Sequence, residues 1–161
     1  MCLFLALPLG AETFEKSLAN GLKLIVREDH RAPVVVSQIW YRVGSSDEQP
    51  GITGVSHALE HLMFKGTKTT KPGEFSRIIA ENGGSENAFT GKHYTAYFQR
   101  IASDRLEICL QLEADRMKNL VFLPHEFEAE MEVIKEERNM RIENSPHARL
   151  YEQFNAAAFA G

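Results

Sequence analysis

The chain has 161 residues, a length that fits one domain with its own hydrophobic core. Apolar residues make up 43% of the sequence and charged residues 25%, which is ordinary for a globular protein. The formal net charge of −4 gives no reason to expect a nucleic acid or an anionic membrane as a partner, and no apolar run approaches the roughly 20 residues of a membrane span.

The first eleven residues, MCLFLALPLGA, carry no charge and end in small residues. This pattern resembles the apolar region and cleavage site of a secretory leader, although the usual basic segment is missing. We interpret residues 1–11 as the remnant of a signal peptide, because Pro8 and Gly10 argue against the alternative of a buried first strand. A leader predicts a periplasmic or secreted protein of bacterial origin. It would also remove Cys2 and leave Cys109 unpaired, so no disulfide framework is expected.

The rest of the sequence alternates between strand and helix patterns. Alternating apolar and polar residues around Ala19-Asn20-Gly21 predict a β-hairpin, and a segment rich in β-branched residues predicts a central third strand. The predicted strands cover 13–18, 22–27, 34–43, 86–90 and 94–101. The predicted helices run from about 55 to 65, over 74–81, from 103 or 104 to about 118, from 124 to about 143, and from about 147. This order predicts an α+β sandwich, with an antiparallel-rich sheet and helices on one face.

The helix from 103 or 104 to about 118 is predicted to be amphipathic. Either Ser103 or Asp104 is the expected N-cap. Its expected apolar face consists of Leu106, Cys109, Leu110, Leu112 and Met117. This pattern makes Cys109 a core residue rather than a metal ligand.

Two histidines with a glutamate between them, His57, Glu60 and His61, form the most informative motif. On an α-helix, residues four apart lie about 40° apart around the axis, so both imidazoles point the same way. Glu60 lies about 60° to the other side of His57, from where its carboxylate can reach a water on the same ion. Two neutral imidazoles suit Zn²⁺, and a carboxylate that is not a ligand suits proton abstraction from a zinc-activated water.

The helix that carries this motif has two distinct faces. Its apolar stripe consists of Val55, Ala58, Leu59 and Leu62, and its other stripe of His57, Glu60, His61 and Phe64. A solvated polar face is the alternative interpretation. It explains poorly why the first turn of that face holds two histidines and a glutamate but no lysine or arginine.

A zinc site needs a third protein ligand, with the fourth position open for water. His93 follows a glycine turn and is expected to be exposed. The acidic helix from residue 124 is the richer source, because Phe127, Met131 and Ile134 define its inward stripe. Glu130 and Glu137 are seven apart, hence about 20° apart around the helix, and flank that stripe. A buried carboxylate needs a partner, and a zinc ion would be one.

With these residues in place, the chain resembles the N-terminal part of an M16-family zinc metallopeptidase, of the pitrilysin, insulysin and mitochondrial-processing-peptidase type. The family pattern is H-x-x-E-H followed by a glutamate about 75 residues on, and here Glu137 stands at that distance from His61. The segment 130–138 resembles the family's E-x-x-V-I-x-x-E ligand helix, and the tract 83–90 resembles its active-site edge strand. The resemblance covers residues 13–161.

The resemblance implies a zinc endopeptidase site with defined roles. His57, His61 and Glu137 would bind one Zn²⁺ ion, and Glu60 would be the general base for peptide hydrolysis. Glu130 would not bind the ion itself but would orient one of the ligand histidines.

The same resemblance implies how an extended peptide or small-protein substrate is held. The substrate would add as a further strand, bound through main-chain hydrogen bonds. The residues that would bind it are Asn87, Ala88, Phe89 and Thr90.

Members of the resembled family are much longer than this chain and contain a second homologous domain. We therefore expect residues 12–161 to be a truncated N-terminal peptidase domain, incomplete at its C-terminus. The missing C-terminal domain or a partner subunit would complete the enzyme, and the isolated chain could be inactive.

Two other functions are compatible with parts of the sequence. A non-catalytic subunit of an M16 pair is one alternative, although such subunits usually lose the zinc pattern that this chain keeps. An S-ribosylhomocysteine lyase-like enzyme, which shares the H-x-x-E-H helix and a related fold, is the other. It needs one cysteine as a metal ligand in a glycine-rich loop and a second, catalytic cysteine, whereas Cys109 is expected within a helix and Cys2 within the leader.

Overall fold

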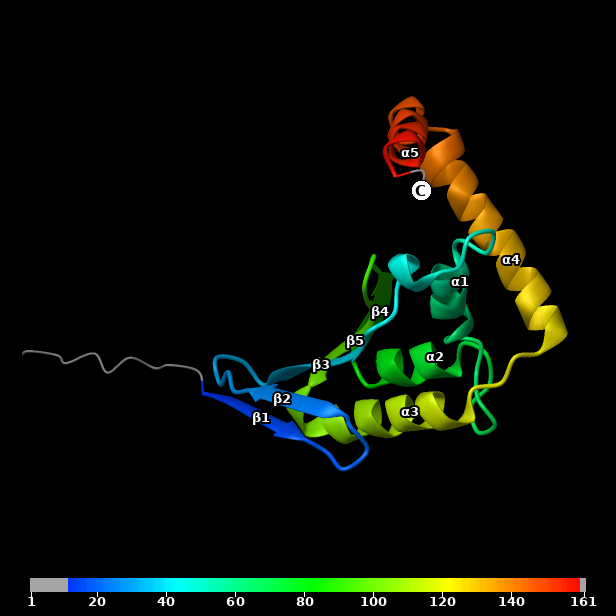
Figure 1. Cartoon of the computed structure of the whole chain (residues 1–161). Coiled ribbons are helices and arrows are strands. Elements are labelled where there is room, and N and C mark those ends of the chain that lie inside the picture. Colours follow the sequence, from blue (N-terminus) through cyan, green and yellow to red (C-terminus); the bar gives the residue numbers. More distant parts are fainter. Residues whose placement is uncertain (1–11, 160–161) are drawn as a thin grey trace, which may run out of the picture. The chain divides into compact units, whose positions relative to one another are not determined.

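The structure is a computed structural model that describes residues 12–159, so the segment interpreted as a leader, residues 1–11, lies outside the described residues. The chain divides into two compact units, one up to Val34 and one from Val35, and each is described by itself. The strands are β1 (Thr13–Ser17), β2 (Lys23–Arg27), β3 (Val34–Tyr41), β4 (Ser85–Thr90) and β5 (Thr95–Ala102) (Figure 1). The helices are α1 (Val55–Leu62), α2 (Glu74–Glu81), α3 (Leu106–Asn119), α4 (Pro124–Arg138) and α5 (Pro146–Ala158). The predicted α+β class is confirmed.

The first unit contains the predicted β-hairpin. β1 and β2 pair antiparallel, with Thr13 opposite Arg27 and Ser17 opposite Lys23. Gly21 in the turn has a φ of +87°, a conformation that glycine adopts without steric cost. The sequence pattern therefore predicted this element correctly to within one residue at each inner end.

The second unit contains a three-stranded sheet in the order β3-β5-β4. β4 and β5 pair antiparallel, with Ser85 opposite Arg100 and Thr90 opposite Thr95. The prediction that residues 34–43 form the central strand is wrong, because β5 occupies the centre and β3 lies at an edge. Burial is consistent with this order: five of the eight residues of β5 are buried, whereas β3 leaves about half of Val34 and Val36 exposed.

The core lies between α2, α3 and β5. It consists of Phe75, Ile79, Ile101, Cys109 and Leu112. Cys109 is fully buried, as predicted, and burial raises the pKa of its thiol. No helix in the described part of the chain is long and apolar enough to cross a membrane.

The apolar face predicted for α3 is only partly correct. Leu110 and Met117 are about half exposed, and Glu113 and Arg116 are buried in their place. The Arg116 guanidinium lies on the rings of three aromatic residues, Phe64, Phe75 and Tyr97. Neither predicted N-cap caps this helix, because both lie in a short 3₁₀ turn, Ser103–Arg105, that precedes it.

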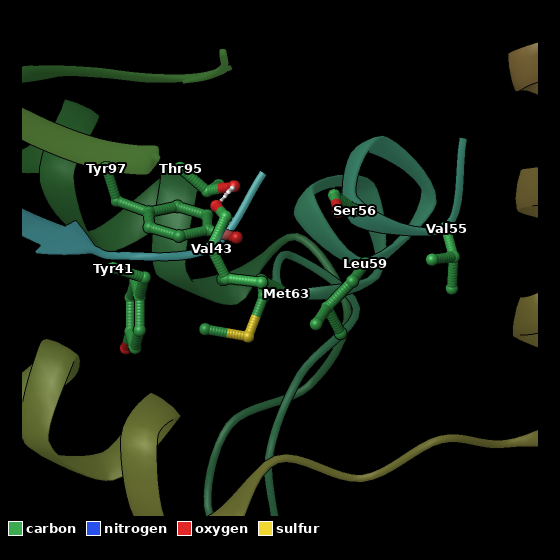
Figure 2. Close-up of a pocket in the computed structure, with 8 residues that line it drawn as sticks. All are labelled: Tyr41, Val43, Val55, Ser56, Leu59, Met63, Thr95 and Tyr97. Carbon is green, nitrogen blue, oxygen red and sulfur yellow. Dashed lines mark hydrogen bonds between the residues drawn. The ribbon is translucent and has the colours of Figure 1, made fainter. Parts of the chain in front are cut away.

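Helix α1 presents its two predicted stripes to different surroundings. Val55 and Leu59 of the apolar stripe, with Met63 just after the helix, line an apolar cavity of about 220 Å³ (Figure 2). Tyr41 of β3 and Tyr97 of β5 complete its wall. The stripe with the two histidines faces a different cavity. The helix ends at Leu62, three residues earlier than predicted, and the chain then turns through Gly66, which has a φ of +100°.

Candidate metal centre

Helices α1 and α4 pack against each other and bring the predicted site residues together. A cavity of about 530 Å³ lies between these helices and β4. Every predicted site residue lines it: His57, Glu60, His61, Asn87, Ala88, Phe89, Thr90, Glu130 and Glu137. Phe64, Lys65 and Arg141 complete the wall.

His57, His61 and Glu137 place three potential ligand atoms around one point. The Nε2 atoms of the two histidines lie 3.2 Å apart. Oε2 of Glu137 lies 3.3 Å from Nε2 of His61 and 3.5 Å from Nε2 of His57. Ligand atoms at about 2.0 to 2.2 Å from a tetrahedral zinc ion lie about 3.3 to 3.6 Å from one another. The three atoms are therefore spaced as the ligands of a single zinc ion would be.

The buried carboxylate oxygen of Glu137 supports this fit. Within the described residues, Oε2 of Glu137 is buried and accepts no hydrogen bond. A buried, unpaired carboxylate oxygen is costly unless a cation or a donor compensates it. A divalent cation between the three atoms would supply that compensation.

Glu130 fixes the ring of His61. The Nδ1 atom of His61 lies 2.8 Å from Oε1 of Glu130, which is buried. Because an ionised carboxylate only accepts, Nδ1 carries the proton and Nε2 keeps its lone pair for a metal. Burial alone would raise the pKa of Glu130, but hydrogen bonds from Lys65 and His61 outweigh burial and lower it.

Arg141 pairs with the other oxygen of Glu137. Its guanidinium forms an ion pair with Oε1, with 2.8 Å between Nη1 and the oxygen, and Oε2 faces the histidines. Arg141 lies in a π-helical turn, Asn139–Glu143, that follows α4 directly. π-Helical turns of this kind occur frequently at functional sites.

Glu60 lies beside the histidines on the same face of α1 and does not belong to the three-atom cluster. Its Oε2 atom accepts a hydrogen bond from the hydroxyl group of Thr90, at the end of β4. Both side chains are partly buried and line the same cavity. A carboxylate in this position can exchange a proton with a water in the cavity.

Strand β4 is an edge of the sheet beside the cavity. Ala88 and Thr90 are half-buried, whereas Asn87 and Phe89 are exposed, as expected for alternating strand faces. The main-chain N–H of Ala88 donates to Oδ1 of Asn87 at 2.8 Å. An edge strand of this kind can accept an extended peptide as a further strand.

The other metal-binding residue types considered from the sequence lie outside the cluster. His93 is exposed, as predicted, and Cys109 belongs to the core. Among the described residues, the only group of three or more potential ligands within bonding range of one ion is His57, His61 and Glu137.

Two charged residues at the site were missed from the sequence. Lys65 binds Glu130, and Arg141 binds Glu137. The sequence does contain a spacing signal, because Lys65 follows His61 by four residues and Arg141 follows Glu137 by four, as neighbours on one helical face do. In the structure, however, Lys65 lies in the turn after α1 and Arg141 in the π-helical turn after α4.

Comparison with known proteins gives concordant matches over nearly the whole chain. The family model described as Insulinase (Peptidase family M16) matches residues 23–161. Zinc protease PqqE of Helicobacter pylori is 39% identical over 144 residues, which are 89% of this chain and 32% of that protein. The beta subunit of the mitochondrial-processing peptidase of Dictyostelium discoideum is 31% identical over 156 residues, which are 96% of this chain and 33% of that protein.

A solved structure, the crystal structure of a protease from Helicobacter pylori, matches with a TM-score of 0.86 and 37% identity. The match covers 90% of this chain and 35% of that one. This chain thus spans about a third of the length of the curated relatives it matches.

Proposed function

We propose that this chain, which belongs to the insulinase family of peptidases (family M16), carries the zinc site and general base of a metalloendopeptidase. Family membership supports a zinc metallopeptidase. The observation that carries the finer proposal is the spacing of 3.2, 3.3 and 3.5 Å between the three ligand atoms. His57, His61 and Glu137 are the proposed ligands, and Glu130 holds His61 in the required tautomer.

The chemistry follows from the groups around the cavity. A zinc ion bound there supplies Lewis acidity, which lowers the pKa of water and stabilises negative charge on the oxygen of a peptide carbonyl. Glu60 accepts a proton from the attacking water while the water oxygen bonds to the carbonyl carbon. Glu60 then delivers that proton to the amine nitrogen as the C–N bond breaks.

The substrate is proposed to be an extended peptide or a small protein bound along β4. Asn87, Ala88, Phe89 and Thr90 offer an edge beside the proposed ligands, and main-chain hydrogen bonds would hold a further strand there. Oδ1 of Asn87 covers the N–H of Ala88 in this structure, so an incoming peptide would exchange one hydrogen bond for another.

Hydrolysis is proposed for the full-length protein rather than for these 161 residues alone, since the relatives are about three times as long. A domain or subunit beyond this chain is the proposed source of the remaining substrate contacts. The lyase-like alternative is disfavoured, because it needs a cysteine ligand and Cys109 is fully buried in the core.

Glu60→Gln tests the proposal most simply. In the full-length protein, this variant should keep its zinc and lose peptide hydrolysis by about 10²- to 10⁴-fold, since a positioned general base contributes that much. Cleavage of internally quenched peptides and the zinc content of the purified protein are the two measurements. Glu107→Gln, at an exposed position of α3, is the matched control and should behave as the wild type. Near-normal hydrolysis by Glu60→Gln would contradict the assignment.

A further inference from the structure

The hydrogen bond from Thr90 to Glu60 joins two residues with different expected roles. The family resemblance implies substrate binding for Thr90 and proton transfer for Glu60. The hydroxyl of Thr90 donates to Oε2 of Glu60, across 30 residues of sequence and from a different element.

The alternation of β4 explains why Thr90 faces the helix. Exposed and half-buried residues alternate along the strand, and Thr90 shares the half-buried face with Ala88. α1 packs against β4, so the last side chain on this face meets the helix that carries Glu60. The Thr90 hydroxyl therefore binds Glu60, while the main chain of Thr90 remains part of the edge strand.

The contact makes the two oxygens of Glu60 inequivalent. Oε2 accepts from Thr90, and within residues 12–159 Oε1 accepts no hydrogen bond from the protein. A carboxylate held through one oxygen has its rotation restricted, so the other oxygen is presented in one direction. Such orientation matters to rate, because a reacting group misplaced by about 1 Å can cost about 10²-fold.

We propose that Thr90 is a positioning residue, whose hydroxyl orients the Glu60 carboxylate so that Oε1 is the proton-accepting oxygen. This inference rests on the proposed function of Glu60. It separates the side chain of Thr90, which acts through Glu60, from the main chain of β4, which would bind substrate.

The test uses two substitutions in the full-length, zinc-loaded protein. Thr90→Val removes the hydroxyl but keeps the shape and the β-branching, and Thr90→Ser keeps the hydroxyl. Thr90→Val should lower kcat about 10- to 100-fold with KM and zinc content unchanged, and Thr90→Ser should retain most of kcat. Thr13→Val, the same change at an exposed position of β1 and outside the cavity, is the matched control and should leave kcat unchanged.

A double-substitution cycle identifies the partner of Thr90. If Thr90 acts through Glu60, adding Thr90→Val to Glu60→Gln should cause little further loss of the residual rate. An equal loss in both backgrounds, or a rise in KM at constant kcat, would overturn the proposal, the latter in favour of a substrate-binding side chain.

Crystal structures of the wild type and of Thr90→Val separate this proposal from the peptidase function. The Glu60 carboxylate should bind Thr90 in the wild type and adopt a different or a mixed rotamer in the variant. An unchanged Glu60 rotamer would overturn the positioning role even if the protein cleaves peptides. If the wild type cleaves no peptide but the rotamer changes as expected, the peptidase proposal fails and the orienting contact stands.

Discussion

Glu130 is a buried carboxylate whose two oxygens both have cationic or N–H partners. Oε1 faces Nδ1 of His61, and Oε2 forms an ion pair with Lys65. Burying a carboxylate without such partners would cost several kcal/mol. Glu130 therefore contributes to the proposed metal centre in three ways. It compensates the charge of Lys65, it fixes the tautomer of His61, and it links α4 to the segment that contains α1.

Glu130→Gln should weaken zinc binding about 10- to 100-fold, the usual effect of removing an outer partner of a ligand histidine. Competition with a chelating dye measures the affinity. Glu128→Gln, an exposed position on the same helix, should bind zinc as the wild type does. Equal affinities for Glu130→Gln and Glu128→Gln would refute the role of Glu130.

The sequence was sufficient to predict which residues line the candidate site, but not which other side chains form hydrogen bonds or ion pairs with them. Helical spacing alone placed His57, Glu60 and His61 on one face, and the inward stripe of α4 favoured Glu130 and Glu137 among many glutamates. Which side chain meets which across two elements depends on how those elements pack. The contact between Thr90 and Glu60 therefore could not be read from spacing within either element.

At the scale of elements, the N-terminus of α1 depends on a residue of the preceding loop. Oε2 of Glu48 accepts from the N–H of Gly54 at 2.7 Å, and Oε1 accepts from the N–H of Ser56 at 2.8 Å. These N–H groups would otherwise have no partner within the helix, and the negative charge also suits the helix dipole. Local sequence patterns do not predict this cap, because Glu48 lies six and eight residues before the N–H groups that it binds.

Glu48→Gln should lower the free energy of unfolding by about 0.5 to 2 kcal/mol at pH 7, as loss of a helix cap does. Burial alone would raise the pKa of Glu48, but the N–H groups of Gly54 and Ser56, together with the Ser56 hydroxyl, outweigh burial and lower the pKa. A lowered pKa in the folded state means that the carboxylate stabilises the fold above its unfolded-state pKa of about 4.3, and that this contribution is lost as the pH falls through the folded-state value.

Urea unfolding of the wild type and Glu48→Gln between pH 3 and pH 7 measures this dependence. The difference in stability between them should be largest at neutral pH and shrink below about pH 4. Glu107→Gln, exposed on α3, serves as the control and should show no comparable difference. A Glu48→Gln penalty that is constant across this range would contradict the capping account.

Helix α3 shows where periodicity misleads. The predicted apolar face included Leu110 and Met117, which are half exposed, whereas Arg116 is buried on three aromatic rings. Glu113 pairs with Arg116 and also accepts from Gln99 of β5. Helical periodicity assigns charged residues to the solvent-exposed face and therefore cannot predict a buried ion pair. The partners of such a pair are identified only from the packed structure.

At the scale of the whole molecule, the chain joins residues of α1, β4 and α4 into one site. The α+β class, most element boundaries and the two-helix origin of the site could be predicted, because each follows from local patterns or from the family resemblance. The central position of β5 could not, since strand order depends on long-range pairing. The periplasmic or secreted location and the leader in residues 1–11 stay predictions.

The zinc content of the purified protein tests the central claim most directly. The wild type should bind one zinc ion per chain, measured by elemental analysis after dialysis, and Glu137→Gln should lose it. Glu136→Gln changes the adjacent, exposed residue of the same helix and should keep the full complement. One zinc ion per chain retained by Glu137→Gln, or none bound by the wild type, would contradict a metal centre built from His57, His61 and Glu137.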